Sequence, residues 1–155
     1  MTERTLRVLV WTAGAAWLAS WFLPVMDDAW GCQAFRYSIS GVWPYHGTRP
    51  SDAEDAIPLL LGACTNFAFV AMIAMLLRNR VTRPGLFFRV ALACLLIDLY
   101  FPVQAARAEG LQALRELLIG YWAWLLAFVL VCVVGGFSAF SNRRTSKTPT
   151  AGTPA

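Results

Sequence analysis

The sequence predicts an all-α integral membrane protein, an antiparallel bundle of four transmembrane helices with an outer cap made of a loop and a short helix. First, 58% of the residues are hydrophobic and 14% are charged, whereas soluble domains have roughly 45–50% apolar and roughly 25% charged residues. Second, four apolar runs are each long enough to cross a hydrocarbon core of about 30 Å at about 1.5 Å per residue. Third, the basic residues gather at one side of these runs.

The first apolar run covers residues 8–26 and contains no charge. Thr12, Ala16 and Ser20 recur at every fourth position, which gives one helix face small enough for close packing against another helix. A cleaved signal peptide is the alternative, because residues 1–7 have the basic character of its first region. The length of the run and the lack of an A-x-A cleavage site favour a retained helix.

Three further spans are predicted, over residues 57–77, 86–104 and 117–140. Pro58 lies in the first turn of the second span, where its missing N–H costs little. Pro84 and Gly85 separate the second span from the third, which is the least apolar because it carries Arg89 and Asp98. The fourth span is uncharged and gives the strongest prediction.

The distribution of Lys and Arg predicts the orientation, because cytoplasmic flanks retain positive charge. Nine of the thirteen basic residues fall on one side of the spans: Arg4, Arg7, Arg78, Arg80, Arg83, Arg89, Arg143, Arg144 and Lys147. The four on the other side are diluted by seven acidic residues. We therefore expect a multi-pass protein of the cell inner (cytoplasmic) membrane with both termini in the cytoplasm. Residues 1–140 would form the transmembrane domain, and residues 141–155, rich in Ser, Thr, Pro and Lys, a disordered cytoplasmic tail.

The segment 27–56 is too long for a minimal turn and is predicted to form the outer cap. Five aromatic residues give it apolar mass: Trp30, Phe35, Tyr37, Trp43 and Tyr45. We expect a short helix over residues 32–40 within it. Residues 105–116 are predicted to form an interfacial helix that leads into the fourth span, with Leu111 and Leu114 on one face.

Four cysteines in a four-helix membrane protein suggest comparison with disulfide-forming quinone oxidoreductases of the DsbB type, which share this topology. That chemistry needs two thiols close enough to exchange through a mixed disulfide. Only Cys32 lies outside the predicted spans, whereas Cys64, Cys94 and Cys132 fall within them and are expected to pack as small apolar side chains. The sequence therefore argues against a thiol oxidoreductase.

Asp98 is the most informative residue, because an ionised carboxylate in the bilayer is costly and marks a functional site by default. It lies about 9 Å inside the outer end of the third span, and Asn66 on the second span is near enough in depth for a hydrogen bond between the two. This intramembrane polar pair would serve a proton or cation path. The alternative is a carboxylate that reaches the outer interface or caps a helix contact. We favour this alternative because no second acid lies in a predicted span.

No set of residues for catalysis or metal binding is evident. His46 is the only histidine, and the nearby acids Asp52, Glu54 and Asp55 have no recognised zinc spacing. The motifs H-E-x-x-H, G-x-S-x-G and the P-loop are missing. The basic residues flank apolar runs and do not form one soluble face, so nucleic acid is not an expected partner. We predict no cofactor, no metal and no catalytic residue.

Three segments resemble a group of small, uncharacterised bacterial four-helix inner-membrane proteins. They are Trp-Phe-Leu-Pro-Val at residues 21–25, Trp-Gly-Cys-Gln-Ala-Phe at residues 30–35 and Gly-Tyr-Trp-Ala-Trp-Leu at residues 120–125. These are similar to the Leu-Pro turn, the Gly-x-x-Ala segment and the final Gly-Tyr-aromatic-x-Trp-Leu helix of that group. The resemblance implies the four-helix fold and no particular activity.

Three functions remain open from the sequence. The first is a non-enzymatic accessory, immunity-type or scaffold protein that engages a membrane or periplasmic protein through the aromatic outer cap. The second is a small transporter or channel that uses Asp98, oligomeric because four helices enclose little volume. The third, least favoured, is a membrane oxidoreductase or lipid-acting enzyme dependent on Cys32 or His46. The lipid bilayer is a partner in each case, and a homo-oligomer is compatible with each.

Overall fold

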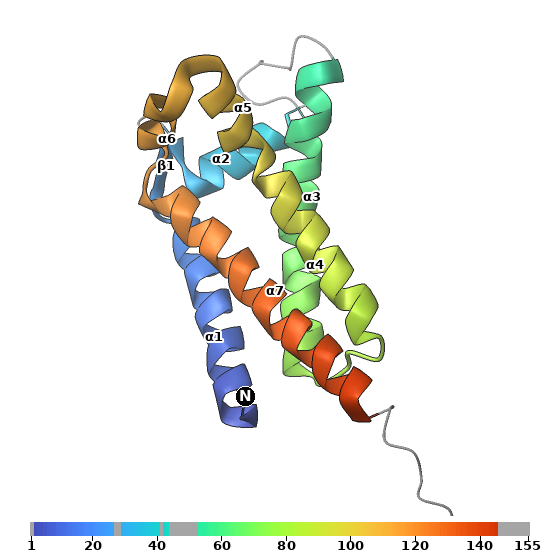
Figure 1. The fold of residues 1–155 in the computed structure, drawn as a ribbon. Coiled ribbons are helices and arrows are strands. Elements are labelled where there is room, and N and C mark those ends of the chain that lie inside the picture. The colour runs from blue at the N-terminus through green and yellow to red at the C-terminus, as the bar shows by residue number, and fades with distance from the viewer. Residues whose placement is uncertain (1, 27–28, 41, 44–52, 146–155) are drawn as a thin grey trace, which may run out of the picture.

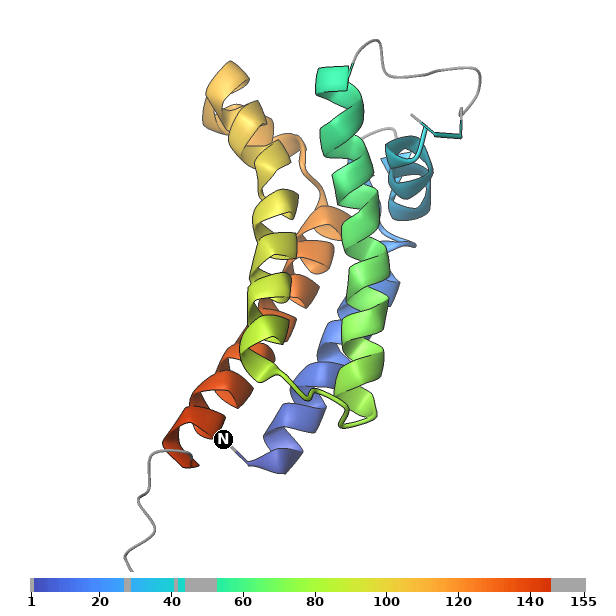
Figure 2. The ribbon, with the colours of Figure 1, turned by 90° about the vertical axis from the view of Figure 1, so that its right-hand side faces the viewer.

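The computed structural model describes residues 2–26, 29–40, 42–43 and 53–145. It is mostly helical, and four long helices run alongside one another (Figure 1). These are α1 (Glu3–Ser20), α3 (Ala53–Leu77), α4 (Pro84–Asp98) and α7 (Ile119–Thr145). α1 packs along α7, α7 along α4, and α4 along α3. The start of α1, the end of α7 and the turn between α3 and α4 lie at one end of the molecule, here called the terminal end (Figure 2).

Three helices are long and apolar enough to cross a membrane, over Ala56–Leu77, Pro84–Gln104 and Ile119–Phe140. They coincide closely with the second, third and fourth predicted spans. Large apolar side chains such as Trp11, Phe67 and Leu96 are exposed on the outside, while Thr65 and Asp98 are buried inside. Large apolar side chains exposed in this number are unusual for a soluble domain and are compatible with a lipid environment, while most of the buried residues are apolar as well.

The first predicted span differs from the structure at its end. α1 stops at Ser20, and residues 24–26 form a β-strand where a helix was expected. The physical reason is Pro24, which lacks an N–H and disfavours helical geometry at Leu23. The uncharged part of α1, residues 8–20, is about 20 Å long, shorter than a hydrocarbon core of about 30 Å. The expected range 8–26 is therefore wrong beyond Ser20.

The other end of the molecule, here called the capped end, carries the cap that the sequence predicted in outline (Figure 1). Strand β1 (Pro24–Met26) pairs antiparallel with β2 (Ala29–Trp30), and α2 (Gly31–Ser38) follows at once, close to the expected short helix over 32–40. Gln33 accepts a hydrogen bond from the Trp30 N–H at 3.0 Å, which satisfies a free donor at the start of α2.

Two glycines let the cap sit directly on the helix ends. A Cβ added to Gly31 would collide with the backbone of Ser20, and one added to Gly120 would lie 2.6 Å from the Pro24 carbonyl oxygen. Backbone hydrogen bonds close the same contacts, from Cys32 N–H to Trp21 O at 3.1 Å and from Leu118 N–H to Val25 O at 2.9 Å. The cap is therefore joined to the end of α1 and to the start of α7.

The expected interfacial helix over 105–116 is divided into shorter pieces. α5 (Tyr100–Glu109) continues the direction of the third span, a 3₁₀ turn occupies Gly110–Gln112, and α6 (Ala113–Glu116) precedes α7. Gly110 has a φ of 77°, which glycine adopts without strain and which ends α5. At the other terminus, α7 continues to Thr145, five residues into the predicted tail, while residues 146–155 lie outside the described residues.

Candidate functional site: a capped cavity beside Asp98

The two polar residues singled out in the predicted spans are both buried near the capped end. Asp98 is 1% exposed at the end of α4, and Asn66 is 8% exposed on α3. Their hydrogen bonds run to other residues. Asp98 Oδ1 lies 2.9 Å from the Thr65 hydroxyl, and Asn66 donates to the Gly62 carbonyl oxygen at 3.2 Å. The expected bond between Asn66 and Asp98 is not among those of the described residues, and Thr65 takes its place.

Asn66 connects three helices through its side-chain oxygen. Asn66 Oδ1 accepts hydrogen bonds from the indole N–H of Trp17 on α1 at 3.0 Å and of Trp124 on α7 at 3.1 Å. Two bonds use both lone pairs of an amide oxygen. Because an unsatisfied polar group is costly in hydrocarbon, these bonds hold α1, α3 and α7 in register at this depth.

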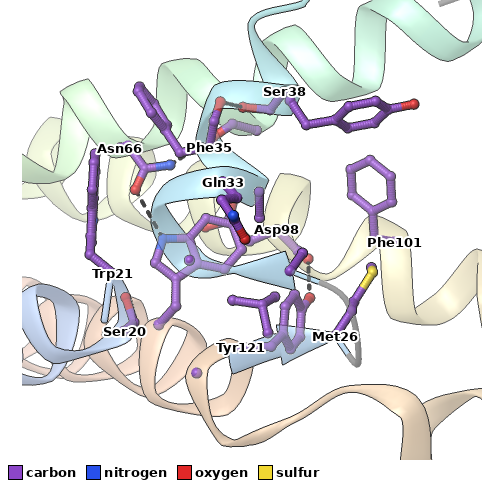
Figure 3. Close-up of a pocket in the computed structure, with 18 of the residues that line it drawn as sticks. Ser20, Trp21, Met26, Gln33, Phe35, Ser38, Asn66, Asp98, Phe101 and Tyr121 are labelled. Atoms are coloured by element: carbon purple, nitrogen blue, oxygen red, sulfur yellow. Dashed lines mark hydrogen bonds between the residues drawn. The ribbon is translucent and has the colours of Figure 1, made fainter. Parts of the chain in front are cut away.

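Asp98 is only partly satisfied. The Thr65 hydroxyl lies 2.7 Å from the Gly62 carbonyl oxygen as well as 2.9 Å from Asp98 Oδ1, and its single hydrogen can serve only one of them. The Tyr121 hydroxyl donates at 2.6 Å to the backbone oxygen of Asp98, not to its carboxyl group (Figure 3). Asp98 Oδ2 has no hydrogen-bond partner among the described residues. A buried polar atom without a hydrogen-bond partner is unusual in proteins and calls for an explanation.

A cavity of about 450 Å³ adjoins Asp98 at the capped end. Its wall combines the end of α1, the β1–β2 hairpin, α2, and the capped halves of α3, α4 and α7. Figure 3 shows labelled side chains from these separate segments converging on one space. The lining is mostly apolar, with Asp98, Asn66 and Gln33 among its polar members. A volume in this range, apolar walls and a few polar groups are the usual features of a small-molecule site.

A second cavity, of about 520 Å³, lies at the terminal end. Each long helix contributes residues to both cavities. Along each helix, buried core residues lie between the residues that line the terminal cavity and the residues that line the capped cavity. We call this core the central layer; it comprises Ala13, Phe69, Met72, Phe87, Ala91, Cys94, Ala127, Phe128, Val131 and Cys132. The rings of Phe69 and Phe128, 5.0 Å apart between centroids, lie within it. The two cavities are therefore not continuous in this structure.

The predicted outer interaction surface divides into exposed and inward-facing residues. Trp30, Tyr37 and Trp43 are 53%, 47% and 67% exposed. Phe35 turns inward, with its ring 4.9 Å from that of Trp21 and 5.8 Å from that of Phe67. Tyr45 lies outside the described residues. Arg36 donates a hydrogen bond to the Trp43 carbonyl oxygen at 2.7 Å, and the Arg36 guanidinium lies 4.6 Å from the centre of the Trp43 ring. These two contacts hold Trp43 in position.

The cysteines do not assemble a redox pair. All four are free thiols, with Cys32 and Cys64 exposed and Cys94 and Cys132 buried. The expectation that Cys64 packs inside is wrong, because it lies on the outward face of α3. No group of three or more His, Cys, Asp or Glu side chains that could hold a metal occurs in the described part of the chain. His46 falls outside that part.

Several residues around Asp98 and the cavity were not identified from the sequence. Thr65 had a signal, because a hydroxyl next to Asn66 in a span often reaches a neighbouring helix. Tyr121 and Trp124 were noted only within the Gly-Tyr-Trp-Ala-Trp-Leu segment, and nothing in the sequence placed them beside the cavity. No family model, curated protein or solved structure matches the chain, so the site must be interpreted from its own chemistry.

Proposed function

We propose that the chain is a four-pass protein of the inner membrane, with α1 as the fourth crossing helix and both termini in the cytoplasm. The capped end then faces outward. Arg78, Arg80 and Arg83, in and beside the turn between α3 and α4, support this orientation, because basic residues favour the cytoplasmic side. The short uncharged part of α1 requires local thinning of the bilayer or a contribution from the cap.

Within this frame, the capped cavity is proposed to bind an amphipathic ligand, and the protein to act as a non-enzymatic accessory protein. The observation that carries the proposal is the Asp98 carboxyl group in the wall of a mostly apolar cavity, 1% exposed and with one oxygen that has no partner among the described residues. A carboxyl group placed in this way costs free energy unless a ligand interacts with it.

A protein partner at the outer face is the second candidate, as the aromatic cap suggested. The observation in its favour is the exposure of Trp30, Tyr37 and Trp43 beside the cavity, since large aromatic residues supply much of the binding free energy at interfaces. A partner seated on these residues would not need the cavity to be empty.

Transport through the molecule is less well supported. The central layer separates the two cavities, so a permeation path would require Phe69 and Phe128 to leave their buried positions. A binding protein needs no such rearrangement.

Filling the cavity tests the ligand-binding proposal. Gly62 lines it, and a Cβ added there meets nothing within 4 Å, so Gly62→Leu should occupy the space without a clash. Gly14→Leu is the matched control, because Gly14 is equally open but lies away from the cavity on α1. Both variants also remove a helix glycine, which stabilises a helix by roughly 0.5–1 kcal/mol.

The measurement is saturation-transfer NMR with phenylbutanol on protein in nanodiscs. We expect a signal from the wild type and from Gly14→Leu, above that of empty nanodiscs, and none from Gly62→Leu. Equal signals from both variants would contradict binding in the capped cavity. A protein partner on the rim would still be captured by Gly62→Leu, which distinguishes the second candidate.

A further inference from the structure

The lining of the capped cavity has an unbalanced charge composition. Among the described residues that line it, Asp98 is the single acidic one and none is Lys, Arg or His. Its side-chain hydrogen-bond partner among the described residues is the uncharged hydroxyl of Thr65 at 2.9 Å, and no salt bridge to it occurs among them. Because burial disfavours the charged form of Asp98, a cation in the cavity would stabilise its carboxylate, and the described lining holds no basic residue that does so.

Aromatic rings form much of the remaining wall. They come from four separate segments of the chain: Trp21, Phe35, Tyr37, Phe101, Tyr121 and Trp124. The faces of such rings carry partial negative charge, which attracts cations, most strongly where water is excluded. Aromatic cages of this kind are the usual means of recognising alkylated ammonium groups. The rings and the acid thus favour the same sign of charge.

The hydrogen-bonding groups around Asp98 favour a donor as its missing partner. Tyr121 and Ser20 donate their hydroxyl hydrogens to backbone oxygens, and the Trp124 indole N–H is bound to Asn66. These donors are already engaged, and Asn66 Oδ1 accepts two bonds. Asp98 Oδ2 is buried and without a partner among the described residues, and in the ionised carboxylate it is an acceptor. Its complement is a group that carries hydrogen-bond donors, which a protonated amine does.

We propose that the capped cavity recognises an organic cation, an ammonium group attached to an apolar body. This deepens the ligand-binding function proposed above and rests on it. The ammonium group lies against the aromatic rings next to Asp98, and the apolar body fills the rest of the space. Asp98 is 1% exposed. Its carboxyl group therefore either rotates to contact the ammonium group or attracts it electrostatically without direct contact, because charges in the protein interior are weakly screened.

The size of the cavity limits the ligand. About 450 Å³ lies in the lower part of the range of roughly 300–1,000 Å³ that accommodates drug-sized molecules. A small amine with one ring or one short chain fits this volume. The same space therefore selects against bulky cations, and the charge selects against acids of equal size.

Three probes that share one apolar body separate charge from shape. They are phenylbutylamine, which is protonated at pH 7, the neutral phenylbutanol and the anionic phenylbutyrate. Binding to the full chain in nanodiscs of zwitterionic lipid is measured by calorimetry, with empty nanodiscs subtracted. We expect the amine to bind at least about tenfold more tightly than the alcohol, and the acid not to bind.

Two variants assign this preference to residues. Asp98→Asn should reduce amine affinity to that of the alcohol while alcohol binding persists, which also shows that the variant is folded. Glu116→Gln is the matched control, because Glu116 is an exposed acid at the same end, outside the lining, and should change neither affinity. Phe101→Leu removes one aromatic face and should weaken amine binding by about two- to fivefold, with a smaller effect on the alcohol.

The outcomes distinguish this inference from the function on which it rests. Equal affinities of amine and alcohol would overturn recognition of a cation and leave ligand binding intact. Failure of all three probes to bind would overturn both. An amine preference that survives Asp98→Asn would also overturn the inference, because it would place the source of selectivity elsewhere. Should Asp98→Asn not fold, the comparison of probes on the wild type and on Phe101→Leu decides the matter.

Discussion

Replacing Asn66 with leucine removes the side chain that joins α1, α3 and α7 through hydrogen bonds. Leucine has the same number and branching of side-chain heavy atoms as asparagine, so the main change is loss of the hydrogen-bond acceptor. The indole N–H groups of Trp17 and Trp124, which lie 3.0 Å and 3.1 Å from Asn66 Oδ1, are then left without their partner. Both bonds are part-buried, so water does not fully replace them.

The expected cost follows from these two bonds. Hydrogen bonds between membrane helices contribute about 0.6 kcal/mol on average and about 1.7 kcal/mol at most, while a buried donor without a partner costs about 1–3 kcal/mol. The better helix propensity of leucine offsets a few tenths of a kcal/mol. We therefore expect Asn66→Leu to lower the free energy of unfolding by about 1–3 kcal/mol.

Reversible unfolding in mixed micelles with increasing dodecyl sulfate measures this loss. Gln104→Leu is the matched control, because its exposed amide only donates to the Tyr100 hydroxyl at 2.9 Å, and it should change stability by less than about 0.5 kcal/mol. Trp17→Phe and Trp124→Phe should each cost less in the Asn66→Leu background than in the wild type. Additivity within about 0.3 kcal/mol in both cycles would refute the three-helix connection.

Two further predictions concern the cap and the orientation. Gly120→Ala would place a Cβ 2.6 Å from Pro24 O and 2.8 Å from Leu23 O. We therefore expect it to lower the free energy of unfolding by about 1–3 kcal/mol in the same assay. Gly85→Ala is the control and should be neutral or stabilising, because a Cβ at Gly85 meets nothing within 4 Å. In a Cys64→Ser background, a membrane-impermeant maleimide added to intact spheroplasts should label the exposed Cys32 and not the buried Cys94 or Cys132; labelling only after permeabilisation would reverse the proposed orientation.

The spans were predictable because uninterrupted apolar runs are local features of the sequence. The second, third and fourth spans agree with the structure to within a few residues. The end of α1 was not predicted, because hydropathy is blind to backbone geometry and residues 21–26 remain apolar after the helix has ended. Pro24 was the available signal, and it was interpreted as a turn near a helix end without shortening the helix.

The site was only half predictable for a different reason. Asp98 and Asn66 are conspicuous as polar residues within apolar runs, and both do line the cavity. Their partners depend on how helices rotate about their axes, which fixes whether Thr65 or Asn66 faces Asp98. The cavity itself is formed by segments as distant as Ser20 and Trp124. Single-sequence patterns contain no information on such convergence.

The central layer assigns closure of the bundle and lining of the capped cavity to different residues. The residues that seal it, Phe69 and Phe128 among them, are not the residues that line the capped cavity. For the proposed ligand-binding protein with its capped end outside, ligand exchange can therefore proceed while the central layer stays closed, so ions do not cross the membrane through the protein. Under the same proposal, substitutions in the cavity lining can change ligand preference without making the protein permeable to ions. Ligand preference and impermeability can then evolve separately.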